Sequence, residues 1–232
     1  MGVRSFPDDL TSEVPEWKRQ TVDRSLQRAR LRAQERTDRF VAAAIELMTE
    51  QGGMDFTVQE VVVRSRMSIR SFYSFFESKE NLLVAVHETV VAEQVVPRLR
   101  TLCAAQSDPL DAVRAYVYGL REMTASSGPA ARALASFTLR LAESRPDSLE
   151  RAIRPQIELL TELLEAADTA GRTNTALEAA KAARLIHNCV IAAVHAEVLA
   201  PGLGDDVSAD ELWTFCARGL CVSDVREVTT GV

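Results

Sequence analysis

The residues between positions 57 and 83 have the types and the spacing needed to present a helix to a nucleic acid. Thr57-Val58-Gln59-Glu60 is a capping box, in which the hydroxyl and the carboxylate each accept a hydrogen bond from a free backbone amide at a helix start. Ser68 and Ser78 can cap two further helices, and Ser65-Arg66-Met67 separates the first helix from the second. Two short helices joined by a three-residue break behind a stabilising helix predict a helix-turn-helix, whose second helix enters the major groove of DNA.

No arrangement of residues predicts catalysis. The sequence contains no G-x-S-x-G, H-E-x-x-H, G-x-x-x-x-G-K-[ST] or G-x-G-x-x-G motif. The four cysteines form no C-x-x-C pair, and Cys216 and Cys221 have no histidine at ligand spacing, so we predict reduced thiols in a cytosolic protein. We therefore expect no enzyme activity, no cofactor and no metal site.

The elements that position the helix-turn-helix are predicted to be helices as well. Of the 232 residues, 47% are hydrophobic and 26% are charged, as in a globular protein, and 10 glycines and 8 prolines are too few for an all-β chain with frequent turns. We predict an all-α fold of about nine helices, because no segment alternates at period two. The expected long helices span residues 37–51, 79–104 with a kink or end at Pro97, 109–126, 129–143, 147–170, 176–200 and 208–223. Capping boxes at Thr175–Glu178 and Ser208–Glu211 mark the start of the last two.

The sequence also lacks targeting and membrane signals. No stretch approaches the roughly 18 uninterrupted apolar residues of a membrane helix, and the first residues have no apolar core of a secretory signal. These features predict a cytoplasmic protein that is not embedded in a membrane.

Positive charge is concentrated near the start of a chain whose net charge is −6. Residues 17–39 contain three acidic side chains and eight basic ones, namely Lys18, Arg19, Arg24, Arg28, Arg30, Arg32, Arg36 and Arg39. The absence of Pro and Gly after Pro15 would allow the helix at 37–51 to extend backward through this stretch. The stretch is compatible with a solvated helix face or disordered arm, and equally with an extension that contacts phosphates or a minor groove.

The segments Thr57–Val62 and Met67–Leu83 resemble the DNA-binding domain of the TetR family of transcriptional regulators. The Phe72-Tyr73 dipeptide, Phe76 three residues after the tyrosine, and Ser78-Lys79-Glu80-Asn81-Leu82-Leu83 carry the resemblance, which covers about residues 37–90. It implies a homodimeric regulator, usually a repressor that a small-molecule effector releases from a palindromic double-stranded DNA operator. It also implies a tail and basic arm at 1–34, a three-helix DNA-binding domain at 35–82, and a larger effector-binding and dimerisation domain at 83–232.

The resemblance assigns DNA contacts to particular side chains. Arg70 would donate twice to a guanine and Ile69 would contact a thymine methyl group, whereas Tyr73 and Lys79 would hold phosphates, although either could instead serve packing or solvation. The full set of expected DNA-binding residues is Thr57, Ser68, Ile69, Arg70, Ser71, Tyr73, Ser74 and Lys79. Phe72 and Phe76 are expected in the core.

Two residues depart from the family pattern. Arg66 stands where glycine is usual in the turn, and a positive φ at a non-glycine residue costs about 1–3 kcal/mol. Phe75 stands where histidine or tyrosine is common, so one phosphate-directed donor is lost.

The larger domain would enclose an effector cavity between the helices from 109 to 170. The expected effector contacts are Tyr116, Leu120, Met123, Phe137, Leu141, Leu160 and His187, for which plain core packing is the alternative. His187 and His195 lie about 80° apart around one helix, so they cannot share a metal without other ligands. They are expected in the core or at an interface if they do not contact the effector.

The last two helices are the expected dimerisation pair. Leu212, Phe215, Cys216 and Gly219 form a stripe suited to close helix contact across a twofold axis. The alternative to a DNA-binding regulator is a helical protein-interaction module without sequence-specific DNA binding.

Overall fold

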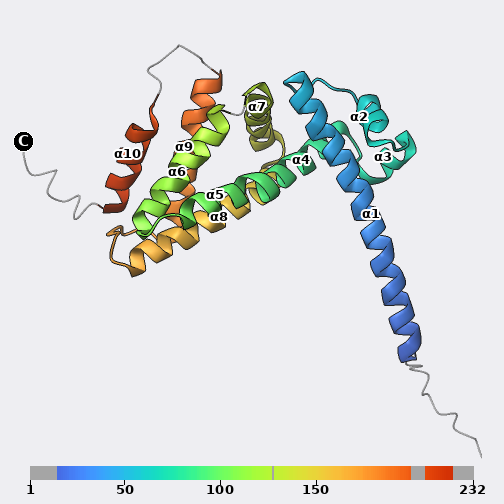
Figure 1. Cartoon of the computed structure of the whole chain (residues 1–232), viewed down its shortest axis with the longest axis horizontal. Helices are drawn as coiled ribbons and strands as arrows, with labels where there is room; N and C mark the ends of the chain where they lie inside the picture. Colours follow the sequence, from blue (N-terminus) through green and yellow to red (C-terminus); the bar gives the residue numbers. More distant parts are fainter. Residues whose placement is uncertain (1–14, 127, 200–206, 222–232) are drawn as a thin grey trace, which may run out of the picture. The chain divides into compact units, whose positions relative to one another are not determined.

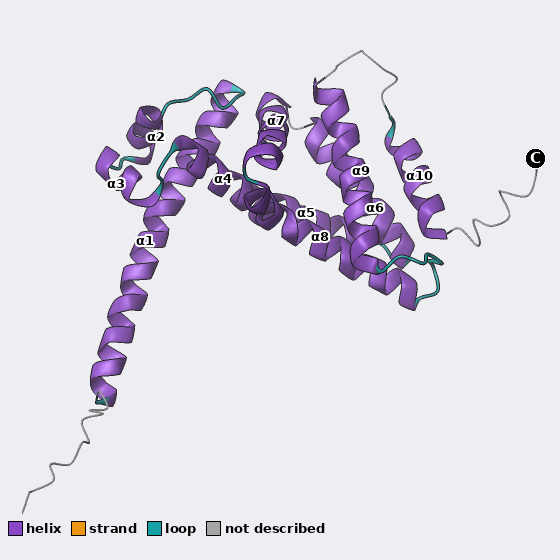
Figure 2. Cartoon of the chain, turned by 180° about the vertical axis from the view of Figure 1, so that it is seen from behind, coloured by secondary structure: helices purple, strands orange, loops and turns teal. Residues whose placement is uncertain are grey.

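The computed structural model describes residues 15–126, 128–199 and 207–221, and within these ranges the chain is helical without a strand (Figures 1 and 2). The elements in order are α1 (Glu16–Gln51), α2 (Val58–Ser65), α3 (Ile69–Phe75), α4 (Lys79–Val90), the π-helical η1 (Val91–Val95), α5 (Val96–Ala104), α6 (Pro109–Ser126), α7 (Gly128–Ser144), α8 (Pro146–Thr169), α9 (Ala179–Leu199) and α10 (Ala209–Cys221). Because α4, η1 and α5 follow one another without a break, they form one continuous rod. The predicted all-α fold is confirmed, with a helix-turn-helix followed by a larger helical part.

The chain divides into two compact units, residues 1–39 and 40–232, and α1 belongs to both. In the first unit the described residues are almost all exposed, and α1 begins at Glu16, so the helix does extend backward through the basic stretch. In the second unit α1 buries one face, formed by Phe40, Val41, Ala44 and Leu47. The predicted boundary between residues 82 and 83 falls inside α4.

An aromatic cluster holds the helix-turn-helix together. The ring of Phe40 on α1 meets Phe72 of α3 edge to face at 5.5 Å between centroids, and Phe76 in the same manner at 6.2 Å. Phe72 and Phe76 are buried as expected. Such aromatic pairs add about 0.5–1.5 kcal/mol beyond the burial of their area, so this cluster fixes α3 against α1.

The rod that follows contains a turn of π-helix before its proline. A kink or end was expected at Pro97, and the structure places Val91–Val95 in a π-helix and Pro97 in the first turn of α5. Pro97 has no N–H to donate to the preceding turn, and the wider π turn accommodates that loss.

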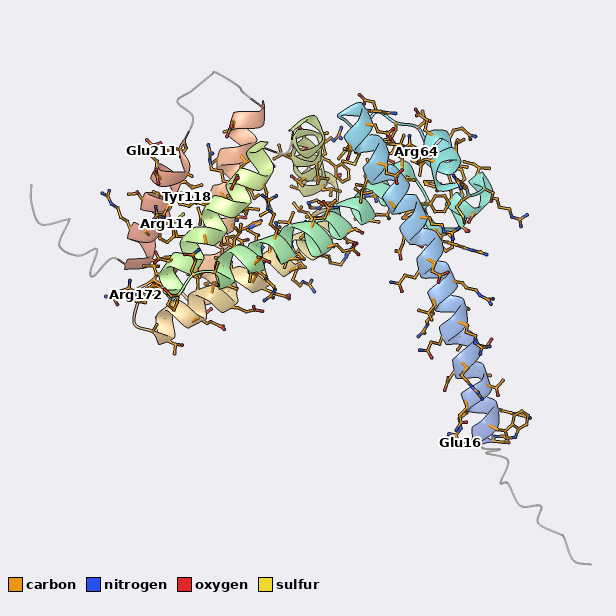
Figure 3. The ribbon with its side chains drawn as sticks, viewed as in Figure 1. Glu16, Arg64, Arg114, Tyr118, Arg172 and Glu211 are labelled. Carbon is orange, nitrogen blue, oxygen red and sulfur yellow. The ribbon has the colours of Figure 1, made fainter. Side chains whose placement is uncertain are left out.

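The larger part has a core of its own. Leu99, Val113, Tyr116, Leu160 and Val190 are fully buried in one cluster contributed by α5, α6, α8 and α9. Arg114 and Tyr118 on α6 lie toward α10, where Tyr118 donates a hydrogen bond to Asp210 and Arg114 lies 3.8 Å from the same carboxylate (Figure 3). The described thiols Cys103, Cys189 and Cys216 are free. No helix in the described ranges is both long enough and apolar enough to span a membrane.

Of the two expected capping boxes near the C-terminus, one is present and one is wrong. The Ser208 amide donates to Glu211 at 2.9 Å and the Glu211 amide donates to the Ser208 hydroxyl at 3.2 Å, which caps α10. The helix expected from residue 176 begins at Ala179 instead, because the Thr175 hydroxyl accepts from the amide of Leu177 and closes a local turn. The expected ends of these two helices at 200 and 223 lie outside the described residues.

Candidate DNA-binding surface and ligand cavity

The turn between α2 and α3 is set by a left-handed residue. Arg66 has φ 55° and ψ 34°, and among the described residues it alone combines a side chain with positive φ. The Arg66 amide donates to Val63 O and the Met67 amide to Val62 O, both at 3.2 Å, which is the Schellman arrangement that ends a helix. The expected strain at this position is therefore present, and the turn keeps the form that glycine would give it.

Side-chain capping fixes the starts of α2 and α3. Thr57 and Glu60 form the predicted capping box of α2, and hydrogen bonds from Thr57 hold the pKa of Glu60 below its usual value. The Ser71 amide donates to the Ser68 hydroxyl at 3.1 Å and caps α3. Because these capping groups are engaged in the fold, Thr57 and Ser68 have a structural role whether or not they also contact DNA.

The exposed face of α3 carries the residues expected to contact DNA. Ile69 is 42% exposed and Tyr73 is 58% exposed, while Phe72, whose ring contacts that of Tyr73, is fully buried. Arg70 is exposed and makes no hydrogen bond or ion pair with any described residue. Ser74 is exposed and donates to Ser71 O, whereas Ser71 itself is half-buried. The face thus presents an unpaired guanidinium, an aliphatic group and a phenol together.

Lys79 is held by the loop that precedes α2. Its ammonium group donates a hydrogen bond to Met54 O and lies 4.7 Å from the centroid of the Phe56 ring. The side chain is half-buried, at the first residue of α4. Lys79 therefore ties the start of α4 to the segment that carries Thr57, and its remaining N–H groups are available to an anion.

An ion-pair network joins α2 to α1 within the helix-turn-helix. Arg64 lies 2.6 Å from a carboxylate oxygen of Glu50 and 3.3 Å from one of Glu46 (Figure 3 labels Arg64). The hydrogen bond from Arg64 lowers the pKa of Glu50. Since the carboxylates are exposed, the pairs contribute orientation more than stability.

A cavity of about 500 Å³ lies between the helix-turn-helix and the larger bundle, inside the second unit. Its walls are mostly apolar and come from α1, α4, η1, α5, α6, α7, α8 and α9. All three histidines of the chain, His87, His187 and His195, line it. Gln94 and Arg98 are exposed lining residues, so the cavity opens to solvent on their side.

His87 brings an unpaired polar atom to this cavity. Its side chain is buried on α4, and Nδ1 has no hydrogen-bond partner. Burial lowers the pKa of His87 to about 4, so the ring is neutral at pH 7. A buried polar atom without a partner is costly, which makes this ring a candidate to bond a ligand.

The other two histidines are already engaged. Tyr116 Oη lies 3.2 Å from His187 Nδ1 and 3.3 Å from Gln156 O, and burial lowers the pKa of His187 to about 4. Thr138 donates to Ala135 O at 2.7 Å, so His195 Nε2, 3.1 Å from the same hydroxyl, must be the donor of that contact. The cavity therefore combines apolar walls with neutral imidazoles. No group of three residues suited to hold a metal occurs in the described ranges.

Part of the chain matches a known protein family. Residues 40–86 match the model of the bacterial regulatory proteins of the tetR family. Within residues 40–86 the chain is therefore similar to the DNA-binding domains of TetR-family regulators. Helices α2 and α3 lie within this match. A search of curated protein sequences gave no match.

Solved structures share the fold of this chain. FadR from Bacillus subtilis in complex with stearoyl-CoA is 16% identical, with a TM-score of 0.61 over 78% of this chain and 98% of that one. FadR from Thermus thermophilus in complex with lauroyl-CoA is 20% identical, with a TM-score of 0.64 over 82% and 97%. RolR in complex with resorcinol is also 20% identical, with a TM-score of 0.64 over 82% and 89%.

The cavity includes only part of the expected effector set. Leu120, Met123 and His187 line it. Tyr116 does not line it but contacts His187. The remaining three pack elsewhere: Leu160 in the core of the larger part, and Phe137 and Leu141 in the cluster of the helix-turn-helix.

Sequence reasoning missed His87, Gln94, Arg98 and Thr138 as lining residues. The signal for His87 was present, since the residue follows the apolar run Leu82–Val86 inside a helix. Its burial depends on packing between segments far apart in the sequence, such as α4 and α8, which periodicity does not reveal.

The stripe expected at the dimer interface is divided between two faces of α10. Leu212 and Cys216 are buried in the protein's own core, whereas Phe215 is 70% exposed and Gly219 has open space around it. On α9, Leu185 is 54% exposed. Among the described large apolar side chains of α9 and α10, Leu185 and Phe215 are therefore exposed, whereas Leu212 and Cys216 are buried.

Proposed function

We propose that this chain is a TetR-family repressor that binds a palindromic operator as a homodimer and leaves it when a small molecule fills the cavity. The exposed face of α3 supports this proposal most directly. Arg70 has no partner in the described protein there, and Ile69 and Tyr73 lie beside it. A bidentate arginine contact to guanine discriminates against other bases by about 1–3 kcal/mol. The protein would act in the cytoplasm, where bacterial DNA lies.

The homodimer would form through α9 and α10. The exposed side chains of Leu185 and Phe215 supply the apolar contact that such an interface needs. A twofold axis would then present two copies of α3 to successive major grooves, about 34–36 Å apart. An inverted repeat is the sequence counterpart of that symmetry.

The effector would be a mainly apolar molecule with uncharged hydrogen-bonding groups. Near pH 7 the buried rings of His87 and His187 are neutral, so they can exchange hydrogen bonds with a hydroxyl or a carbonyl but do not neutralise a carboxylate. A negatively charged end would be accommodated only near Arg98, at the open side. The related folds bind ligands of both kinds, resorcinol in RolR and acyl-CoA in the two FadR proteins.

Ligand binding would be coupled to DNA binding through helices that both sites share. Ile45 and Met48 of α1, and Val86 and His87 of α4, line the cavity. Helix α1 also supports α3 through Phe40, and Lys79 ties the start of α4 to the segment that precedes α2. The ligand shifts DNA affinity only as far as it binds the two conformers unequally. A tilt of the α4–η1–α5 rod would change the distance between the two copies of α3 in the dimer, so that they no longer fit the two half-sites of the operator.

The test of DNA binding starts from a pool of random duplexes. We expect the full chain to enrich one inverted repeat and to bind it at least a thousandfold more tightly than a scrambled duplex. Enrichment of no sequence, with equal affinity for all duplexes, would contradict the proposal and leave a protein-interaction module as the function.

The test of effector binding uses resorcinol and lauroyl-CoA as probes on the selected duplex. We expect at least one of them to bind more weakly to the DNA-bound protein than to the free protein, and to weaken DNA binding by the same factor. Equal affinity of every bound probe with and without DNA would contradict release by an effector.

A further inference from the structure

The first unit of the chain carries a row of arginines on one continuous helix. Within α1, Arg24, Arg28 and Arg32 follow at four-residue intervals, and Arg39 falls on the same side of the helix. Residues 17–39 have eight basic and three acidic side chains, whereas the rest of the chain has 19 basic and 30 acidic ones. The positive charge is thus confined to this segment of an otherwise acidic protein.

These arginines form no ion pair with any described residue of the protein. Arg28, Arg32, Arg36 and Arg39 are exposed and make no ion pair or hydrogen bond with any described residue. Arg24 donates only to the carbonyl of Gln20, one turn earlier. In the second unit, by contrast, Arg64, Arg100 and Arg184 each lie within 3.0 Å of a carboxylate oxygen.

A row of unneutralised guanidinium groups is suited to a polyanion. The planar guanidinium donates in pairs to phosphate oxygens, and successive members of a four-residue row are about 6 Å apart along the helix. The face on the other side holds Val22 and Leu26, followed by Ala29 and Ala33. Two aliphatic side chains and two alanines are a small apolar face for a membrane-surface helix, so the charge pattern favours nucleic acid over lipid.

We propose that residues 17–39 form a second DNA-binding element that holds backbone phosphates of the duplex read by α3. The proposal rests on the DNA-binding function proposed above. Covalent continuity within α1 gives the segment a high effective concentration near any duplex that α3 engages. Phosphate contacts contain no sequence information, so the element raises affinity for all sequences alike and steepens the dependence of binding on salt.

The test compares two full-length double variants that lose the same charge. Arg28→Gln/Arg32→Gln removes the centre of the row, and Arg151→Gln/Arg154→Gln removes two exposed arginines of α8. Dissociation constants for the selected duplex and for a scrambled duplex are measured between 50 and 300 mM KCl, and circular dichroism shows that both variants are folded.

We expect the Arg28/Arg32 variant, which removes two arginines from each subunit of the proposed dimer, to reduce the magnitude of the slope of log K against log salt by about 2–4 and to weaken both duplexes by about tenfold or more at 0.1 M KCl. The α8 variant should match the wild type. If the Arg28/Arg32 variant has the same salt slope and the same affinities as the α8 variant, the inference is overturned. The proposed function still stands in that case, provided that the wild type prefers the selected duplex to the scrambled one. Absence of that preference in the wild type would instead contradict the proposed function.

A separate arm tests the lipid alternative with vesicles of phosphatidylglycerol and phosphatidylcholine. We expect no difference between the wild type and the Arg28/Arg32 variant in vesicle co-sedimentation at physiological salt. Loss of vesicle binding in that variant, with an unchanged salt slope on DNA, would show that the segment is a membrane-surface element and would overturn the inference.

Discussion

Arg70 and Lys79 illustrate how differently two basic residues of one reading unit are held. Arg70 projects from α3 without a partner in the described protein, whereas the ammonium group of Lys79 bonds Met54 O and faces the ring of Phe56. A free guanidinium on the exposed face can donate to base edges, while an anchored ammonium at a helix start suits a phosphate. The two side chains are therefore expected to contribute to specificity and to affinity respectively.

Substituting each residue separates these contributions. Arg70→Ala is expected to lose about 1–3 kcal/mol on the selected duplex and much less on duplexes altered at the base pair it reads. Lys79→Gln should weaken all duplexes by one factor and flatten the salt dependence. Binding to a panel of single-base variants measures both effects, and uniform weakening by Arg70→Ala would show that this residue does not read a base.

His87 is expected to make stability depend on pH. Burial holds its pKa at about 4 in the folded protein, against 6.5 as the ordinary value, so the unfolded chain takes up a proton that the folded protein refuses as pH falls through this interval. The free energy of unfolding should fall by about 1.4 kcal/mol per pH unit for each such group below pH 6.5, and His187 adds a second contribution.

Urea unfolding of the wild type and His87→Gln at pH 7, 6 and 5 measures this effect. The free energy of unfolding of the variant should depend less steeply on pH, by the equivalent of about one proton taken up on unfolding, whatever its stability at pH 7. An unchanged dependence would show that His87 is solvated in the folded protein.

At the scale of elements, the turn between α2 and α3 combines a helix-ending pattern with an unfavourable residue. The amides of Arg66 and Met67 close the Schellman arrangement, and Arg66 keeps its left-handed φ of 55° although it carries a side chain. Glycine adopts this conformation without the steric cost.

Arg66→Gly is therefore expected to raise the free energy of unfolding by about 1 kcal/mol, whereas Arg66→Ala, which keeps the strained φ, should leave it nearly unchanged. Thermal unfolding of both variants checks the prediction. Equal stability of the two would show that φ at this position is not strained.

Elements were predictable where a local signal decides them. The capping groups Thr57 and Ser208 start helices as expected because each motif is satisfied by hydrogen bonds within four residues. Thr175–Glu178 has the same pattern, but the threonine closes a turn with Leu177 and the helix starts later. The π turn at Val91–Val95 was not predictable either, because its apolar spacing does not differ visibly from that of an α-helix.

The parts of the site that one helix forms could be predicted, whereas the parts that several distant helices form could not. The exposed face of α3 could be derived from the position of the core residue Phe72 on one short helix. The cavity could not, because its lining depends on how eight helical segments pack, and that packing places Phe137 and Leu141 against the helix-turn-helix instead.

At the scale of the whole molecule, the proposed dimer requires apolar groups that a single chain leaves exposed. Phe215→Asp combined with Leu185→Asp is expected to weaken dimerisation by about tenfold or more, because a charge replaces an apolar anchor at the contact. Val63→Asp, on a similarly exposed apolar residue of α2, is the control and should not change the dimer. Sedimentation equilibrium measures the dissociation constants, and an unaffected dimer in the double variant would place the interface elsewhere.

The central claim is that two symmetric copies of α3 read one operator. Base-resolution footprinting of the full chain on its selected duplex tests it most directly. We expect two mirror-related blocks of major-groove contacts whose centres are about one helical turn, 34–36 Å, apart. In the Arg70→Ala variant, each block should lose one base contact. A single unsymmetrical block, or protection that does not depend on base sequence, would contradict it.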